Sequence, residues 1–290
     1  MNESIDTLAE APEWFVEALR SEPTVAETMV NGARIVYRTW GNGASGGIVL
    51  VHGGAANSRW WDHIAPLLAT GRRVVALDLS GHGDSDHREA YSLHQWAAEV
   101  LAVASVAGLA DSTMVIGHSL GGLITLHLAR RPDTQLVAAI VIDSPIVEPG
   151  AALAPRHGSG FGSGRSRVYG TAAEAVTRFR PVPAQYSLPW VLDYIAGASI
   201  REVIDGWTWK FDGRIFDGEA TDPAILSDMH CPLVFFAGEN GLVSPGMQRT
   251  IDAAPGITYV QIPDAGHAPM LDQPLALLTG IRTALAGWLH

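Results

Sequence analysis

The chain has a single cysteine, few basic residues and no long hydrophobic run. Cys231 stands alone among 290 residues, which excludes an intramolecular disulfide and a cysteine metal site and suits a reducing compartment. Lys and Arg number 19 against 30 Asp and Glu, so the cations that bind nucleic acid or anionic membranes are scarce. The longest nearly apolar run, Val100 to Ala110, is about half a membrane span. The first residues, MNESIDTL, are acidic where a signal peptide is basic, and we expect a soluble, cytoplasmic protein without nucleic-acid or membrane partners.

Apolar residues make up 47% of the chain, enough to bury a sizeable core. From residue 24 onward, short apolar runs alternate with helical stretches, a pattern that predicts an α/β fold with helices on both faces of a parallel sheet. The runs are Gly47–Val51, Val74–Leu79, Met114–Gly117, Val137–Ile142, Leu233–Ala237 and Thr258–Ile262. Before them, the turn Asn31-Gly32 predicts a hairpin of Thr24–Val30 and Ala33–Trp40.

Two parts of the chain do not show this alternation of strands and helices, and they set the predicted division into an N-terminal segment, an α/β core and an inserted lid. Residues 1–23 predict a helical preface, in which Trp14 and Phe15 belong to an apolar set at helical spacing. Residues 24–144 and 229–290 form the predicted α/β core. Residues 145–228 interrupt it with a Gly- and Ser-rich passage followed by helical stretches, and an insertion of this length indicates a helical lid.

The segment Gly117-His118-Ser119-Leu120-Gly121 lies between an apolar strand and a helix, the setting of a Gly-x-Ser-x-Gly nucleophile elbow. Such a turn forces its central residue to positive φ and leaves no room for side chains two positions away. We therefore expect Ser119 to be a nucleophile presented above the sheet. The N–H of Leu120, at the start of the helix, is predicted to stabilise an oxyanion.

Two further strand ends complete the predicted site. At His52-Gly53-Gly54, Gly54 is expected to donate the second oxyanion N–H, whereas His52 is expected only to hydrogen-bond its own loop. His267 alone among the histidines follows the last predicted strand and precedes the last helix, and histidine titrates near neutrality. We expect His267 to be the general base.

These motifs, in this order and together with Asp78-Leu79-Ser80-Gly81-His82-Gly83-Asp84-Ser85, resemble the α/β-hydrolase superfamily over roughly residues 24–290. The resemblance implies an eight-stranded, mostly parallel sheet and a Ser–His–acid triad. It also implies no cofactor or metal, and a cap after the sixth strand, where residues 145–228 fall. We expect Asp78 and Asp84 to cap their loop rather than to catalyse.

The triad acid departs from the common pattern. In most relatives it follows the seventh strand, at a position that is Gly241 here. Two candidates remain: Glu239, two residues earlier, and Asp143, which ends the sixth strand 24 residues after Ser119. Haloalkane dehalogenases and certain esterases place the acid at this second position, and the sixth strand ends at the same crevice as the elbow. We favour Asp143 and keep Glu239 as the alternative.

A serine at the elbow predicts hydrolysis of a small carboxylic ester or lactone through an acyl-enzyme. Two alternatives stay open: a C–C bond hydrolase or cofactor-free lyase or oxygenase that uses proton transfer, and a ligand-binding receptor with residual hydrolase activity. Within the lid, Trp190, Tyr194 and Trp207 are expected either to bind substrate or to form the lid's own core. Basic residues gather there too, suited to a substrate carboxylate or simply to a solvated surface. They are Arg156, Arg165, Arg167, Arg178 and Arg180.

Overall fold

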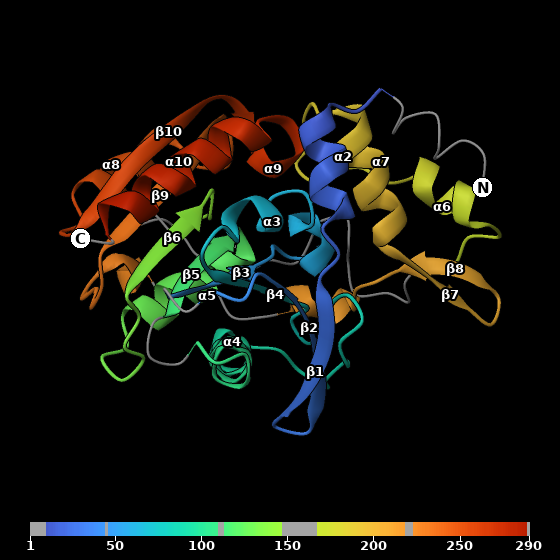
Figure 1. Ribbon diagram of the computed structural model, residues 1–290, viewed down its shortest axis with the longest axis horizontal. Helices are drawn as coiled ribbons and strands as arrows, with labels where there is room; N and C mark the ends of the chain where they lie inside the picture. Colours follow the sequence, from blue (N-terminus) through green and yellow to red (C-terminus); the bar gives the residue numbers. More distant parts are fainter. Residues whose placement is uncertain (1–9, 44–45, 110–112, 147–166, 218–222, 289–290) are drawn as a thin grey trace.

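The structure is a computed structural model that describes residues 10–43, 46–109, 113–146, 167–217 and 223–288 (Figure 1). An eight-stranded sheet with the strand order β1-β2-β4-β3-β5-β6-β9-β10 runs through the molecule. Its strands are β1 (Thr24–Val30), β2 (Ala33–Trp40), β3 (Gly47–Val51), β4 (Arg73–Leu77), β5 (Thr113–His118), β6 (Ala138–Ile142), β9 (Leu233–Asn240) and β10 (Ile257–Gly266). The pairs that involve β2 are antiparallel and all the others are parallel, which confirms the predicted α/β fold.

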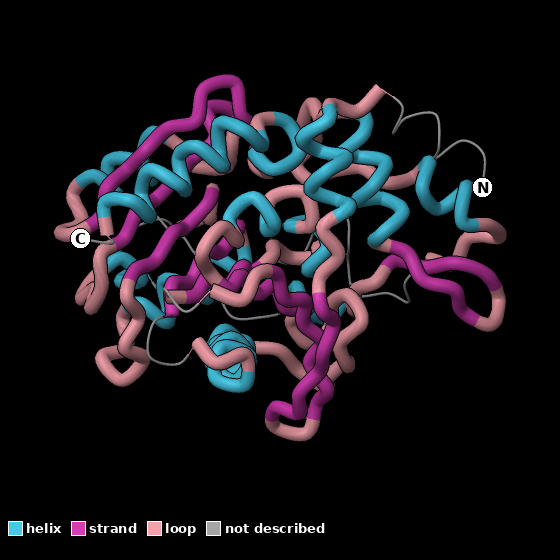
Figure 2. The backbone as a smooth tube through the Cα atoms, in the orientation of Figure 1, coloured by secondary structure: helices cyan, strands magenta, loops and turns pink. Residues whose placement is uncertain are grey.

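Side chains of alternate residues in the central strands pack into two separate hydrophobic cores, one on each face of the sheet. In β3, Ile48 and Leu50 pack into one hydrophobic cluster, whereas Val49 and Val51 pack into another on the opposite face. Helices α2 (Glu13–Arg20), α3 (Ala65–Leu68) and α10 (Pro274–Gly287) contribute to the first cluster, and α4 (Leu93–Val106) and α5 (Leu120–Ala129) to the second. Figure 2 shows helices on both sides of the sheet. Because helices cover both faces of the sheet, side chains on both faces of each central strand are buried, and the strands therefore appear in the sequence as continuous apolar runs.

The segment between β6 and β9 contains helices α6 (Ala172–Thr177) and α7 (Pro189–Ala198). A short antiparallel hairpin follows, formed by β7 (Ile200–Val203) and β8 (Gly206–Trp209). The segment was expected to contain helical stretches, and this hairpin was not predicted. The cause is local, because β-branched and aromatic residues flank Asp205-Gly206, a dipeptide typical of hairpin turns. Residues 147–166, with Arg156 and Arg165, lie outside the described residues.

Asp62 ties this inserted segment to the core. Its carboxylate accepts hydrogen bonds from Arg38 at 3.0 and 3.1 Å, and the hydroxyl of Tyr194 in α7 donates to it at 2.5 Å. Burial raises the pKa of Asp62 against the opposing effect of Arg38. Burial and the neighbouring carboxylate raise the pKa of Tyr194 to about 12, so the phenol remains a hydrogen-bond donor at neutral pH. Phe15 of α2 is fully buried and touches the Tyr194 ring edge-on.

Candidate active site

Ser119 occupies the turn between β5 and α5 with φ of 53°, a conformation that non-glycine residues rarely adopt. The strand and the helix meet so tightly that a Cβ on Gly117 would overlap the carbonyl group of Gly121, and one on Gly121 would overlap the carbonyl of Val51. Glycine at both flanking positions therefore allows the turn, which leaves the Ser119 side chain on the wall of a pocket.

His267 begins the loop after β10, and its imidazole contacts a carboxylate from a different strand. Nδ1 lies 2.7 Å from Oδ2 of Asp143, which directly follows β6. Asp143 is fully buried and also accepts the backbone N–H groups of Gly238 at 3.0 Å and Leu242 at 2.8 Å. A proton on Nδ1 satisfies this carboxylate, which leaves Nε2 of His267 as a proton acceptor.

The structure brings Asp143, and not Glu239, to His267. Glu239 is exposed, and its carboxylate accepts the backbone N–H of Asp264 at 2.8 Å. Gly241, where most relatives carry the acid, faces the Asp143 carboxylate so closely that an added Cβ would lie 2.6 Å from Cγ. The space that a side chain at 241 would occupy is thus filled by the carboxylate of Asp143.

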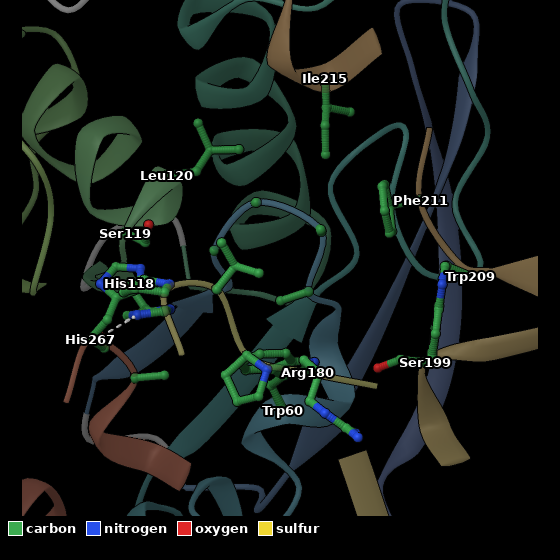
Figure 3. A pocket seen from close by; sticks show the side chains of 18 of the residues that line it. Trp60, His118, Ser119, Leu120, Arg180, Ser199, Trp209, Phe211, Ile215 and His267 are labelled. Carbon is green, nitrogen blue, oxygen red and sulfur yellow. Dashed lines mark hydrogen bonds between the residues drawn. The ribbon is translucent and has the colours of Figure 1, made fainter. Parts of the chain in front are cut away.

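Gly54 lines the same pocket as Ser119 and His267. Leu120 lines it too (Figure 3). Leu120 is the first residue of α5, where an N–H has no partner within the helix. His52 lies behind the pocket wall, with Nδ1 2.7 Å from the carbonyl of Gly53 and Nε2 accepting the N–H of Leu79. Burial lowers the pKa of His52, so it stays neutral and holds the loop, as expected.

His118 supports the base from inside the elbow. Its Nε2 lies 2.8 Å from the carbonyl oxygen of His267, and the two rings are 4.7 Å apart. Burial, followed by the nearby His267, holds the pKa of His118 well below its ordinary value. The neutral ring donates its Nε2 proton to that carbonyl and restrains the loop that carries the base. Asp78 accepts the N–H groups of Ser58 and Asp84, the capping role expected of it.

The pocket has a volume of about 760 Å³ and walls that are mostly apolar. Figure 3 shows Ser119 and His267 on one side of it and Trp209 and Phe211 on the other. Among the described residues, six phenylalanines, tyrosines and tryptophans line it: Trp60, Tyr169, Phe179, Trp209, Phe211 and Phe216. No motif marks these residues in the sequence, because their proximity to Ser119 arises only from the fold.

Trp190, Tyr194 and Trp207 do not line this pocket, although the sequence suggested them for substrate binding. Trp190 and Tyr194 are four residues apart on one face of α7, which packs them against the core cluster beneath. Trp207 packs in a small cluster within the inserted segment. Their positions correspond to the alternative that such rings form the segment's own core.

The described residues contain no group of three or more His, Cys, Asp or Glu side chains placed to hold a metal ion. Within the same residues, no helix has the length and apolar character that crossing a membrane requires.

Comparison with known proteins identifies the family. The model of the alpha/beta hydrolase family matches residues 48–279. The chain belongs to this family. The thioesterase domain from the curacin biosynthetic pathway superposes with a TM-score of 0.74 over 90% of this chain and 99% of that domain, and at 21% identity it shows the shared hydrolase fold.

Two proteins of Mycobacterium tuberculosis are similar in sequence. This chain is 28% identical to the esterase Rv0045c over 88% of each chain. It is 36% identical to the uncharacterized protein Rv2715 over 123 residues, which cover 42% of this chain and 35% of that protein. The chain thus spans about a third of the length of this second relative.

Proposed function

We propose that the protein is a serine hydrolase that cleaves a small carboxylic ester or lactone through an acyl-enzyme. One observation carries the proposal: the imidazole of His267, hydrogen-bonded to buried Asp143, lines the same pocket as Ser119 at the elbow. The similarity to a named esterase supports it. The segment 145–228, whose described part supplies one wall of the pocket, would serve as the lid.

In this mechanism, Nε2 of His267 takes the proton of Ser119 while Oγ attacks the substrate carbonyl. The N–H groups of Gly54 and Leu120 stabilise the resulting oxyanion. Collapse of the tetrahedral intermediate breaks the bond to the leaving oxygen, which receives the proton from His267. Water, deprotonated by the same imidazole, then hydrolyses the acyl-enzyme and regenerates Ser119. Asp143 orients the imidazole and stabilises its protonated form.

Labelling with a fluorophosphonate tests this proposal, because the reagent reacts with a serine that a neighbouring base activates. Intact mass should show one adduct, and peptide mapping should place it on Ser119. The Ser119→Ala variant should take up no label, and His267→Ala should label at least about 100-fold more slowly, the low end of general-base catalysis. A folded wild-type protein that takes up no label would refute the acyl-enzyme and favour proton-transfer chemistry or simple ligand binding.

A further inference from the structure

The charged residues in the described part of the pocket lining are two arginines. Among the described residues, Arg178 and Arg180 line the pocket and no Asp or Glu does, although the chain has a formal net charge of −11. Both arginines lie in the stretch that follows α6. The charged residues of the described lining are thus basic although the chain as a whole is acidic, a local composition that favours an anionic ligand.

The guanidinium groups are available to such a ligand. Arg178 is exposed, and its side chain forms no hydrogen bond or ion pair with any described residue. Arg180 donates from Nη1 to the carbonyls of Thr177 at 3.0 Å and Phe179 at 2.6 Å. These bonds fix one arm of its fork and leave Nε and Nη2 without a partner in the described part of the chain. A guanidinium held in this way is preorganised for a carboxylate.

We propose that the substrate carries a carboxylate beyond an apolar acyl chain, and that Arg178 and Arg180 bind it. The apolar wall accommodates the chain, and an anion on the acyl part is held through both acylation and deacylation. This inference rests on the proposed function and names its substrate class: half-esters of aliphatic dicarboxylic acids.

Paired substrates test the charge preference. The mono-p-nitrophenyl esters of glutarate, adipate and suberate are compared with the p-nitrophenyl esters of pentanoate, hexanoate and octanoate, which match them in chain length but are neutral. At the best chain length, wild-type kcat/KM should favour the anionic ester about tenfold, the size expected of charge-assisted hydrogen bonds. This preference should shrink at about 0.5 M NaCl, because salt screens exposed charges.

Variants assign the preference to the two arginines. Arg178→Gln with Arg180→Gln should abolish the preference, so that kcat/KM falls about tenfold further for the anionic ester than for the neutral one. Arg178→Gln alone, which breaks no described contact, should remove part of it. Arg201→Gln is the matched control, since Arg201 belongs to the inserted segment but does not line the pocket. A wild-type preference for the neutral ester at every chain length, or an equal loss for both esters, would overturn the inference.

A calorimetric titration with adipate separates this inference from the proposed function, because it requires no turnover. Wild-type protein should bind adipate more tightly than the double variant does. Equal binding, or none, refutes the anion site, whereas missing fluorophosphonate labelling refutes only the acyl-enzyme.

Side chains also hold the backbone on both sides of His267. Oδ2 of Asp272 accepts the N–H of Gly266 at 2.6 Å. Beyond the imidazole, Oε1 of Gln185 accepts the N–H of Ala268 at 2.8 Å, and its Nε2 donates to the carbonyl of Ala268 at 3.1 Å. The same Nε2 donates to Asp272 at 3.0 Å, so one side chain of the inserted segment joins both restraints.

We infer that Gln185 is a positioning residue that makes the orientation of His267 depend on the docking of the inserted segment. Nearby, the N–H of Leu188 donates to the carbonyl of Leu271 at 2.8 Å, which holds the same two segments together. The imidazole must meet both Asp143 and Ser119, and a displacement of about 1 Å in such a site costs about 100-fold in rate. Gln185 also lines the pocket, but its amide oxygen and nitrogen bond Ala268 and Asp272, so we expect the loss of these bonds to act on kcat more than on substrate affinity.

Gln185→Ala should lower kcat and the rate of fluorophosphonate labelling by about tenfold, with KM within about twofold. Gln185→Glu should be at least as damaging, since the carboxylate keeps the bond from the Ala268 N–H but repels Asp272. Tyr186→Ala is the control, because this neighbouring side chain is 70% exposed and does not line the pocket. A raised KM with unchanged kcat would contradict the positioning role.

Proton NMR gives a readout that does not depend on turnover. The Nδ1 proton of His267, hydrogen-bonded to Asp143, should give a strongly downfield signal in the wild type and in Tyr186→Ala. This signal should broaden or vanish in Gln185→Ala at an unchanged melting temperature. Its persistence in Gln185→Ala would overturn the inference.

Discussion

Asp143→Asn provides the sharpest test of the candidate triad. Three donors converge on the Asp143 carboxylate: the Gly238 N–H reaches Oδ1, and the Leu242 N–H and the His267 imidazole reach Oδ2. An asparagine offers one acceptor oxygen and one NH₂ group in their place. Because every neighbour donates, the NH₂ group meets a donor in either orientation.

If the NH₂ group faces Gly238, two buried donors oppose each other, at a cost of about 1–3 kcal/mol in folding stability. If it faces His267, it donates to Nδ1 and drives the imidazole proton to Nε2, where the ring can no longer accept the proton of Ser119. Both orientations remove the charge that stabilises the imidazolium. We expect kcat to fall about 10⁴-fold, which equals roughly 5 kcal/mol of transition-state stabilisation at 1.36 kcal/mol per decade.

The assay is hydrolysis of p-nitrophenyl butyrate, with thermal melting to verify folding. Glu239→Gln is the matched control, because Glu239 is exposed and bonds only the Asp264 N–H among the described residues. Its activity should stay within about twofold of wild type, as for surface substitutions elsewhere. Asp143→Asn activity within about tenfold of wild type, together with loss of most activity in Glu239→Gln, would refute Asp143 as the triad acid.

Three further predictions concern the glycine at 241, the position of the triad acid and the buried His63. Gly241→Ala should lower both kcat and melting temperature, because the new Cβ would lie 2.6 Å from Cγ of Asp143, whereas Gly197→Ala in α7, with open space around it, should leave both unchanged or slightly raise stability. Asp143→Gly combined with Gly241→Asp should recover at least about tenfold of the activity that Asp143→Gly alone loses, because the new carboxylate starts beside the old one; no recovery would argue against a shared acid position. Burial lowers the pKa of His63 to about 4 in the folded state, so below pH 6.5 the unfolded state binds the extra proton and stability falls by up to about 3 kcal/mol near pH 4. In His63→Gln, denaturant titrations between pH 6.5 and 4 should show a shallower loss, and an identical slope would contradict the assignment.

Patterns within short stretches of chain predicted much of this fold. The strands and helices follow from apolar periodicity, which needs no knowledge of distant contacts. The hairpin β7–β8 escaped prediction although Asp205-Gly206 marks its turn, because no proline or glycine separates helix α7 from β7.

Local sequence patterns could not select the triad acid. The sequence left Asp143 and Glu239 both open, since each lies at the carboxyl end of a strand that ends near the elbow. The pairing of β6 with β9 decides between their positions: it brings the N–H groups of Gly238 and Leu242 onto the Asp143 carboxylate beside His267. Glycine at 241 is explained only by that contact.

The sequence by itself determined the parallel sheet, the elbow at Ser119 and the position of His267 after the last strand, because each depends on residues close together in the chain. Only the tertiary structure decided which carboxylate meets the imidazole, which rings line the pocket and how Gln185 reaches the loop of His267. The Gln185–Ala268 and Asp143–His267 contacts join residues that are 83 and 124 positions apart. Their geometry depends on strand register and helix packing, which no local pattern encodes.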